Sequence, residues 1–99
     1  PCDRFYFDGF VPHKKGRPKR LSALLEMPCT VVLYESPHRV AKLLDQLDDL
    51  GAGQRIVALS REISKLHEET LRGTVLELKA HLASHPPRGE YVVVLGTAD

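Results

Sequence analysis

Three short runs dominated by apolar and β-branched residues constrain the fold of this 99-residue chain most strongly. They comprise residues 30–34, 56–59 and 91–95, and the apolar side chains follow one another without polar alternation. Such runs are typical of strands that are covered on both faces of a sheet. Amphipathic segments separate them. The sequence therefore predicts a single α/β domain over residues 1–99, with a layered mixed β-sheet flanked by helices.

The segments between these strands carry helix signals. Ser36-Pro37 suits a helix start, because serine caps free N–H groups and proline sacrifices no hydrogen bond at the first position. The apolar stripe of this helix consists of Val40, Leu43, Leu44 and Leu47. Residues 74–77 form a capping box that opens a second helix, which runs to about residue 84. Weaker patterns predict a strand over residues 4–7 that Asp8-Gly9 stops, a short helix that starts at Leu21 and ends near Pro28, and an edge strand over residues 69–72.

Polar side chains follow two of the predicted strands directly. Residues 34–39 read Tyr-Glu-Ser-Pro-His-Arg, and residues 60–62 read Ser-Arg-Glu. Ligands of open α/β sheets bind beyond the carboxyl ends of the strands, so the sequence predicts a binding site at these two segments. The alternative is purely structural, namely a capped turn in which Glu35 and Arg39 are solvated or form an ion pair.

Basic residues are concentrated at the start of the chain. Residues 1–20 hold six basic and two acidic residues, a local balance of +4, whereas the remainder has a balance of −3. Proline and glycine interrupt residues 12–20, and no hydrophobic face is present. This pattern predicts an exposed loop that contacts nucleic-acid phosphates without reading sequence. The alternative is a flexible loop kept soluble by its charge. The predicted phosphate contacts are Lys14, Lys15, Arg17, Lys19 and Arg20.

Several classes of protein are disfavoured. No apolar run approaches the roughly 18 residues that a membrane-spanning helix needs. The two cysteines are too few and too oddly placed for a disulfide framework, and no Cys/His cluster has zinc-ligand spacing, so we expect a cytoplasmic protein without a metal. Gly-rich phosphate loops and the dinucleotide fingerprint are missing. The opening Pro1-Cys2-Asp3 has no signal-peptide pattern, and we expect a longer chain upstream.

Five strings in a fixed order resemble one protein family. They lie at residues 7–16, 34–39, 61–69, 72–74 and 89–92, and Tyr-Glu-Ser-Pro-His-Arg at 34–39 and Lys-Leu-His-Glu-Glu at 65–69 are the most specific. Together they resemble the second half of the bacterial ribosomal small-subunit RNA methyltransferase I family, whose members methylate a cytidine 2′-hydroxyl. That family belongs to the tetrapyrrole methylase superfamily. The resemblance covers essentially the whole chain.

The resemblance implies a C-terminal lobe of a two-lobed, homodimeric enzyme that binds S-adenosylmethionine in the cleft between its lobes. The Gly-rich cofactor loops of the family lie in an N-terminal lobe that this chain lacks. Small-subunit ribosomal RNA is the implied substrate. The resemblance also implies three edges that contact the cofactor, and they match Tyr34 and Glu35, Glu62 and Ile63, and Gly89, Glu90 and Tyr91. Porphyrin-modifying relatives have Met where Glu35 stands, so the sequence departs from their pattern there.

A ribose hydroxyl is a poor nucleophile that benefits from a general base or a polarising cation. Within this lobe we assign positioning or deprotonation to Glu35, with His38 and Arg39 orienting the ribose or a phosphate. Two other functions remain open. A lobe that methylates a tetrapyrrole or another small molecule would share the fold, but such a substrate would not explain the basic segment. A stand-alone RNA-binding module would carry no chemistry. In either enzymatic case, we expect the isolated lobe to be inactive.

Overall fold

Five strands form one sheet in the computed structural model, which describes residues 6–10 and 15–97. The strands are β1 (Tyr6–Phe10), β2 (Val31–Glu35), β3 (Ile56–Ser64), β4 (His67–Thr74) and β5 (Tyr91–Leu95). Their spatial order is β1-β2-β5-β3-β4. β1 is parallel to β2, and all other neighbouring strands are antiparallel. The predicted α/β fold with a mixed sheet is therefore confirmed.

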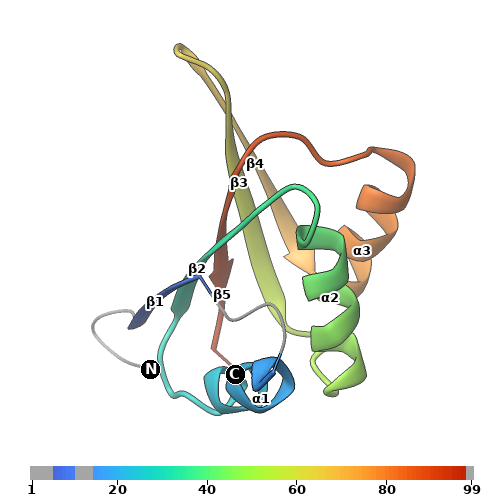
Figure 1. Ribbon diagram of the computed structural model, residues 1–99. Helices are drawn as coiled ribbons and strands as arrows, with labels where there is room; N and C mark the ends of the chain where they lie inside the picture. Colours follow the sequence, from blue (N-terminus) through green and yellow to red (C-terminus); the bar gives the residue numbers. More distant parts are fainter. Residues whose placement is uncertain (1–5, 11–14, 98–99) are drawn as a thin grey trace.

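Three helices contribute to a single hydrophobic core on one face of this sheet. They are α1 (Arg17–Leu25), α2 (Val40–Asp49) and α3 (Val75–Ser84), and α2 and α3 lie side by side (Figure 1). The predicted stripe of α2 is buried, as are alternate strand residues such as Leu33, Leu59 and Val93. Because one stripe of each helix meets one face of the strands, these layers bury a common core.

The opposite face of the sheet is less covered. Val32, Val92 and Val94 are half-buried there, and Tyr34 is 40% exposed. The prediction that the strands are covered on both faces was wrong for the residues that the structure describes. Antiparallel neighbours surround β5, and antiparallel sheets commonly leave one face accessible. A continuous apolar run therefore did not require a second helical layer within this chain.

Two elements near the N-terminus differ from their predicted bounds. β1 continues through Asp8-Gly9 to Phe10, because a bulge between Phe7 and Gly9 accommodates Asp8 as the extra residue, and Gly9 adopts a φ of 72°. α1 begins at Arg17 and not at residue 21, so residues 17–20 of the predicted basic loop are helical. Pro18 tolerates this start, since a proline in the first turn removes no helical hydrogen bond.

The two predicted helix starts at serine and threonine had opposite outcomes. The capping box of α3 is confirmed: Thr74 Oγ1 accepts the Glu77 N–H at 3.1 Å, and Glu77 Oε1 accepts the Thr74 N–H at 2.8 Å. The predicted start at Ser36 was wrong. Residues 36–39 form a turn in which the N–H groups of Arg39 and Val40 donate to Ser36 O at 3.1 and 3.0 Å, and α2 begins only at Val40.

β3 and β4 form a long hairpin whose tip projects beyond the rest of the molecule (Figure 1). The predicted edge strand over residues 69–72 is confirmed but longer, and β3 continues past residue 59 to Ser64. Lys65-Leu66 makes the turn without the Asn or Gly that usually signals a two-residue hairpin. For this reason the sequence did not reveal the hairpin.

Hydrogen bonds of the Arg55 side chain link the end of β5 to the end of α1. Its Nε and Nη2 donate to Gly96 O at 3.1 and 2.7 Å, and its Nη1 donates to Leu25 O at 3.0 Å. Burial lowers the pKa of Arg55 from its usual value. Cys29 is disulfide-bonded, which runs against the expectation that the two cysteines are too few and too oddly placed for disulfide pairing. None of the helices in the described ranges has the length and apolar character needed to cross a membrane.

Candidate functional site

The predicted cofactor edges converge at one end of the sheet. Glu35, at the end of β2, lies opposite Tyr91, at the start of β5, and Tyr91 in turn lies opposite Arg61 of β3. Glu62 follows Arg61, and Glu90 precedes Tyr91. Segments that are 26 or more residues apart in the sequence therefore meet at the same end of the sheet, as the resemblance implied. Because β5 runs antiparallel to β2 and β3, its first residue lies beside the last residue of β2 and beside Arg61 within β3.

Two adjoining pockets occupy this edge. The first has a volume of about 270 Å³ and is lined by Tyr34, Glu90, Tyr91 and Val92. The second, of about 210 Å³, shares Glu90 and Val92 with it and is also lined by Ser60, Arg61, Glu62 and Glu68. An aromatic wall beside carboxylates suits a ligand that combines a flat apolar group with positive charge.

Glu35 lines neither of these two pockets. It is 2% exposed, on the same side of β2 as Leu33, whereas Tyr34 points to the opposite face. Its Oε2 accepts a hydrogen bond from Arg17 Nη2 at 2.9 Å, and its Oε1 accepts the Ser36 N–H at 3.2 Å. A buried carboxylate held in this way is not available to deprotonate a substrate. The geometry supports the structural alternative, with Arg17 in place of Arg39 as the ion-pair partner.

His38 and Arg39 lie in the turn between β2 and α2. His38 is exposed and Arg39 is half-buried, so both are accessible from solvent. The Arg39 backbone belongs to the turn and to the first hydrogen bond of α2, because Arg39 O accepts the Leu43 N–H at 2.8 Å. Their predicted role in orienting a ribose or a phosphate stays a prediction. In the same turn, Ser36 Oγ is buried and has no hydrogen-bond partner in the described part of the chain.

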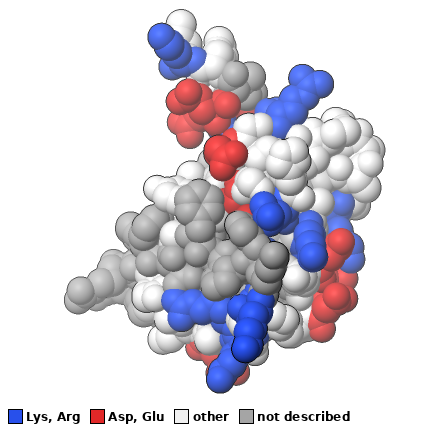
Figure 2. Space-filling model, viewed as in Figure 1, with Lys and Arg blue, Asp and Glu red and all other residues white. Residues whose placement is uncertain are grey.

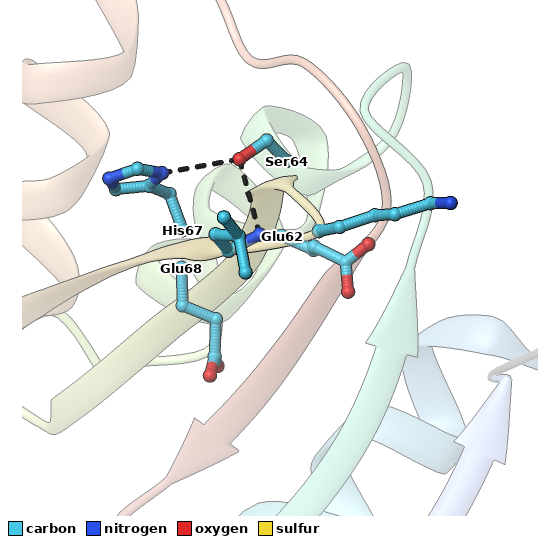
Figure 3. A pocket seen from close by; sticks show the side chains of 6 residues that line it. Glu62, Ser64, His67 and Glu68 are labelled. Atoms are coloured by element: carbon cyan, nitrogen blue, oxygen red, sulfur yellow. Dashed lines mark hydrogen bonds between the residues drawn. The ribbon is translucent and has the colours of Figure 1, made fainter.

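The hairpin tip forms a third, smaller pocket of about 150 Å³ (Figure 3). Ser64 Oγ lies 3.3 Å from His67 Nδ1 and accepts the Leu66 N–H at 3.4 Å. The carboxylates of Glu62 and Glu68, which oppose each other across the hairpin, point away from the imidazole. Ile63 lies on β3, but its side chain is outside the described residues, so its predicted cofactor contact stays a prediction.

The predicted RNA-binding cations differ in their exposure to solvent. Lys15 and Lys19 are exposed, and Arg20 is half-buried and donates from Nη2 to Tyr6 Oη at 3.0 Å. Arg17 is 3% exposed, so the prediction that it lies on an open loop was wrong. Lys14 lies outside the described residues. Figure 2 shows basic side chains gathered over the region of α1, and acidic ones below the hairpin tip and on the side of α2 and α3. No group of three or more metal-binding side chains occurs within residues 6–10 and 15–97.

Curated relatives match the whole chain, although no family model does. The chain is 42% identical over 101 residues to "Ribosomal RNA small subunit methyltransferase I" of Mesorhizobium japonicum, covering 100% of this chain and 34% of that protein. It is 42% identical over 98 residues to the protein of the same name from Pseudomonas aeruginosa (96% and 35%). The protein of that name from Thermotoga maritima is 38% identical over 95 residues (96% and 42%). The chain thus spans only about a third to two fifths of these relatives.

Solved structures share the fold at lower identity. A cobalt precorrin-4 methyltransferase superposes with a TM-score of 0.68 at 17% identity, over 94% of this chain and 40% of that one. A uroporphyrin-III C-methyl transferase from Thermus thermophilus, complexed with S-adenyl homocysteine, gives 0.63 at 20% identity, over 95% and 42%. These similarities confirm that the chain has the fold of one lobe of such methyltransferases.

Proposed function

Because the chain belongs to the ribosomal RNA small subunit methyltransferase I family, we propose that it is one lobe of an S-adenosylmethionine-dependent RNA methyltransferase. The whole enzyme would methylate a cytidine 2′-hydroxyl in small-subunit ribosomal RNA. The identity of about 40% over the full chain carries this proposal. The N-terminal cofactor loops and the homodimeric assembly are part of the same proposal. It also places the protein in the cytoplasm, where bacterial ribosomes assemble.

The pockets at the sheet edge fit one side of the cofactor. Tyr34 and Val92 offer apolar surface for an adenosine, and Glu90 and Glu62 offer negative charge to a cationic group. S-adenosylmethionine supplies an activated methyl group when it is bound. The residues of this chain therefore need mainly to bind and orient it against the nucleophile. The open side of the pockets leaves room for the Gly-rich loops of the other lobe.

The basic surface fits an RNA phosphate backbone. Lys15 and Lys19 are exposed at the start of α1, and no acidic residue occupies the first turn of that helix. Such cations position a nucleic acid without reading its sequence. His38 and Arg39 are the candidates for orienting the ribose, whereas Glu35 is no longer proposed as a base. A tetrapyrrole-methylating lobe shares the fold, but this basic surface favours RNA.

Replacing the accessible lysines tests the RNA assignment. In the full-length protein, Lys15→Ala/Lys19→Ala should weaken binding to small-subunit ribosomal RNA. Each lost phosphate contact should reduce the slope of log K against log salt by roughly one unit. The fold should be unaffected, since surface substitutions change stability by no more than about 0.5 kcal/mol. Filter binding over a range of salt concentrations measures both values. An unchanged slope and affinity would remove α1 from the RNA interface and favour a small-molecule substrate.

A further inference from the structure

The start of α1 is intrinsically weak as a helix end. Gly16 occupies the N-cap position with a φ of 87°, and no side chain makes a capping hydrogen bond. The first turn has no acidic residue but contains Arg17, Lys19 and Arg20. Cations at a helix N-terminus oppose the helix dipole, so neither capping nor local electrostatics fixes this turn.

The side chain of Arg17 ties this turn to two other elements. Its Nη2 donates to Glu35 Oε2 of β2 at 2.9 Å, and its Nε donates to Gln46 Oε1 of α2 at 2.7 Å. The side chains of Arg17 and Glu35 are each only 3% exposed. Glu35 Oε1 in addition accepts the N–H of Ser36, the first residue of the turn that carries His38 and Arg39. One carboxylate thus connects the basic start of α1 with the end of β2.

Stability alone is a poor reason for this arrangement. The desolvation of two charges offsets most of their attraction, and apolar replacement of a buried ion pair is often neutral or stabilising. Leu21 and Leu24 already anchor α1 in the core, at 1% and 0% exposure. What the ion pair adds is a fixed position for the first turn relative to Tyr34, the neighbour of Glu35 that lines the cofactor pocket.

We propose that Arg17 and Glu35 are a positioning pair. It holds the RNA-binding cations of α1 at a fixed position relative to the cofactor pocket at the end of β2. The pair touches neither the RNA nor the cofactor. It sets where the bound RNA lies relative to the methyl group, and misplacement of reacting atoms by about 1 Å can cost on the order of 100-fold in rate. This inference rests on the proposed function.

The double variant Arg17→Met/Glu35→Gln in the full-length protein tests the pair. It removes both charges together and keeps an amide oxygen for the Ser36 N–H. We expect a melting temperature within about 5 °C of the unaltered protein. Affinities for S-adenosylhomocysteine and for ribosomal RNA should stay within about threefold, because the cations and the pocket remain. The single-turnover rate of methyl transfer, at saturating RNA and cofactor, should fall about 100-fold.

A matched control is Lys79→Met, which removes ion pairs of Lys79 Nζ to Asp48 (3.1 Å) and Asp45 (3.3 Å) between α3 and α2. It should leave the single-turnover rate unchanged. An unchanged rate in the folded double variant would overturn the proposal. If the double variant melts far below the unaltered protein, Arg17→Lys decides, because it keeps a cation beside Glu35 but loses the hydrogen bond to Gln46, with an expected loss of roughly tenfold. No methyl transfer by the unaltered protein would overturn the proposed function itself, and the positioning role with it.

Discussion

At the scale of single residues, the structure differs from the sequence-based expectation where charged side chains are buried. Arg17 and Glu35 each sit in a polar segment, and such segments are usually solvated. Their pairing depends on α1 starting early enough to bring Arg17 against the end of β2, which no local spacing encodes. The predicted partner, Arg39, is close in sequence but lies in the turn. Long-range ion pairs of this kind become visible only once the packing of the elements is known.

Removing one member of this pair should be far more damaging than removing both charges. Arg17→Met alone leaves Glu35 buried without its ion-pair partner, which we expect to lower the free energy of unfolding by about 3–5 kcal/mol. Urea unfolding of the single variant and of Arg17→Met/Glu35→Gln measures the difference. Equal losses in the two variants would mean that the carboxylate reaches solvent or another partner when Arg17 is absent.

At the scale of secondary-structure elements, the sequence predicted the layers better than their ends. The strands over residues 31–35 and 91–95 and the buried stripe of α2 match expectation, because apolar periodicity reports the core directly. The cap of α3 was also predictable, since both partners lie within four residues. The start of α2 and the β3–β4 hairpin were not: an extra turn shifts the former, and Lys65-Leu66 lacks the usual turn residues.

Two alanine substitutions compare the cap that forms with the cap that does not. Thr74→Ala should lower the free energy of unfolding by about 1 kcal/mol, because the Glu77 N–H loses its acceptor. Ser36→Ala should be neutral or stabilising, since its buried Oγ has no partner among the described residues. Chemical denaturation of both variants tests this contrast. A comparable loss for Ser36→Ala would indicate that Ser36 caps a helix after all.

At the scale of the whole molecule, the described residues form open pockets at one end of the sheet. The family resemblance predicted that Tyr34, Glu62 and Glu90 lie close together. The register of β2, β5 and β3 places them at the same end of the sheet. The exposed sheet face and the open pockets could not be read from the strand pattern, because a solid apolar run is compatible with one or two covering layers. The chain spans 34%, 35% and 42% of the length of the three relatives named above.

The isolated chain should therefore bind the cofactor hardly at all. Calorimetric titration of residues 1–99 with S-adenosylmethionine is expected to give no saturable heat at micromolar concentrations, whereas the full-length protein should bind. The reason is that ligand sites usually bury most of the ligand surface, and these pockets are open on one side. Micromolar affinity of the isolated chain would show that the cofactor site is complete within this lobe.

The central claim is that this lobe belongs to an enzyme that methylates a ribose of small-subunit ribosomal RNA. Its most direct test incubates the full-length protein with isotopically labelled S-adenosylmethionine and unmethylated small ribosomal subunits, followed by nuclease digestion and mass spectrometry of the nucleosides. The account predicts the label in 2′-O-methylcytidine. Label that is absent from RNA but present on a tetrapyrrole substrate offered in parallel would contradict it.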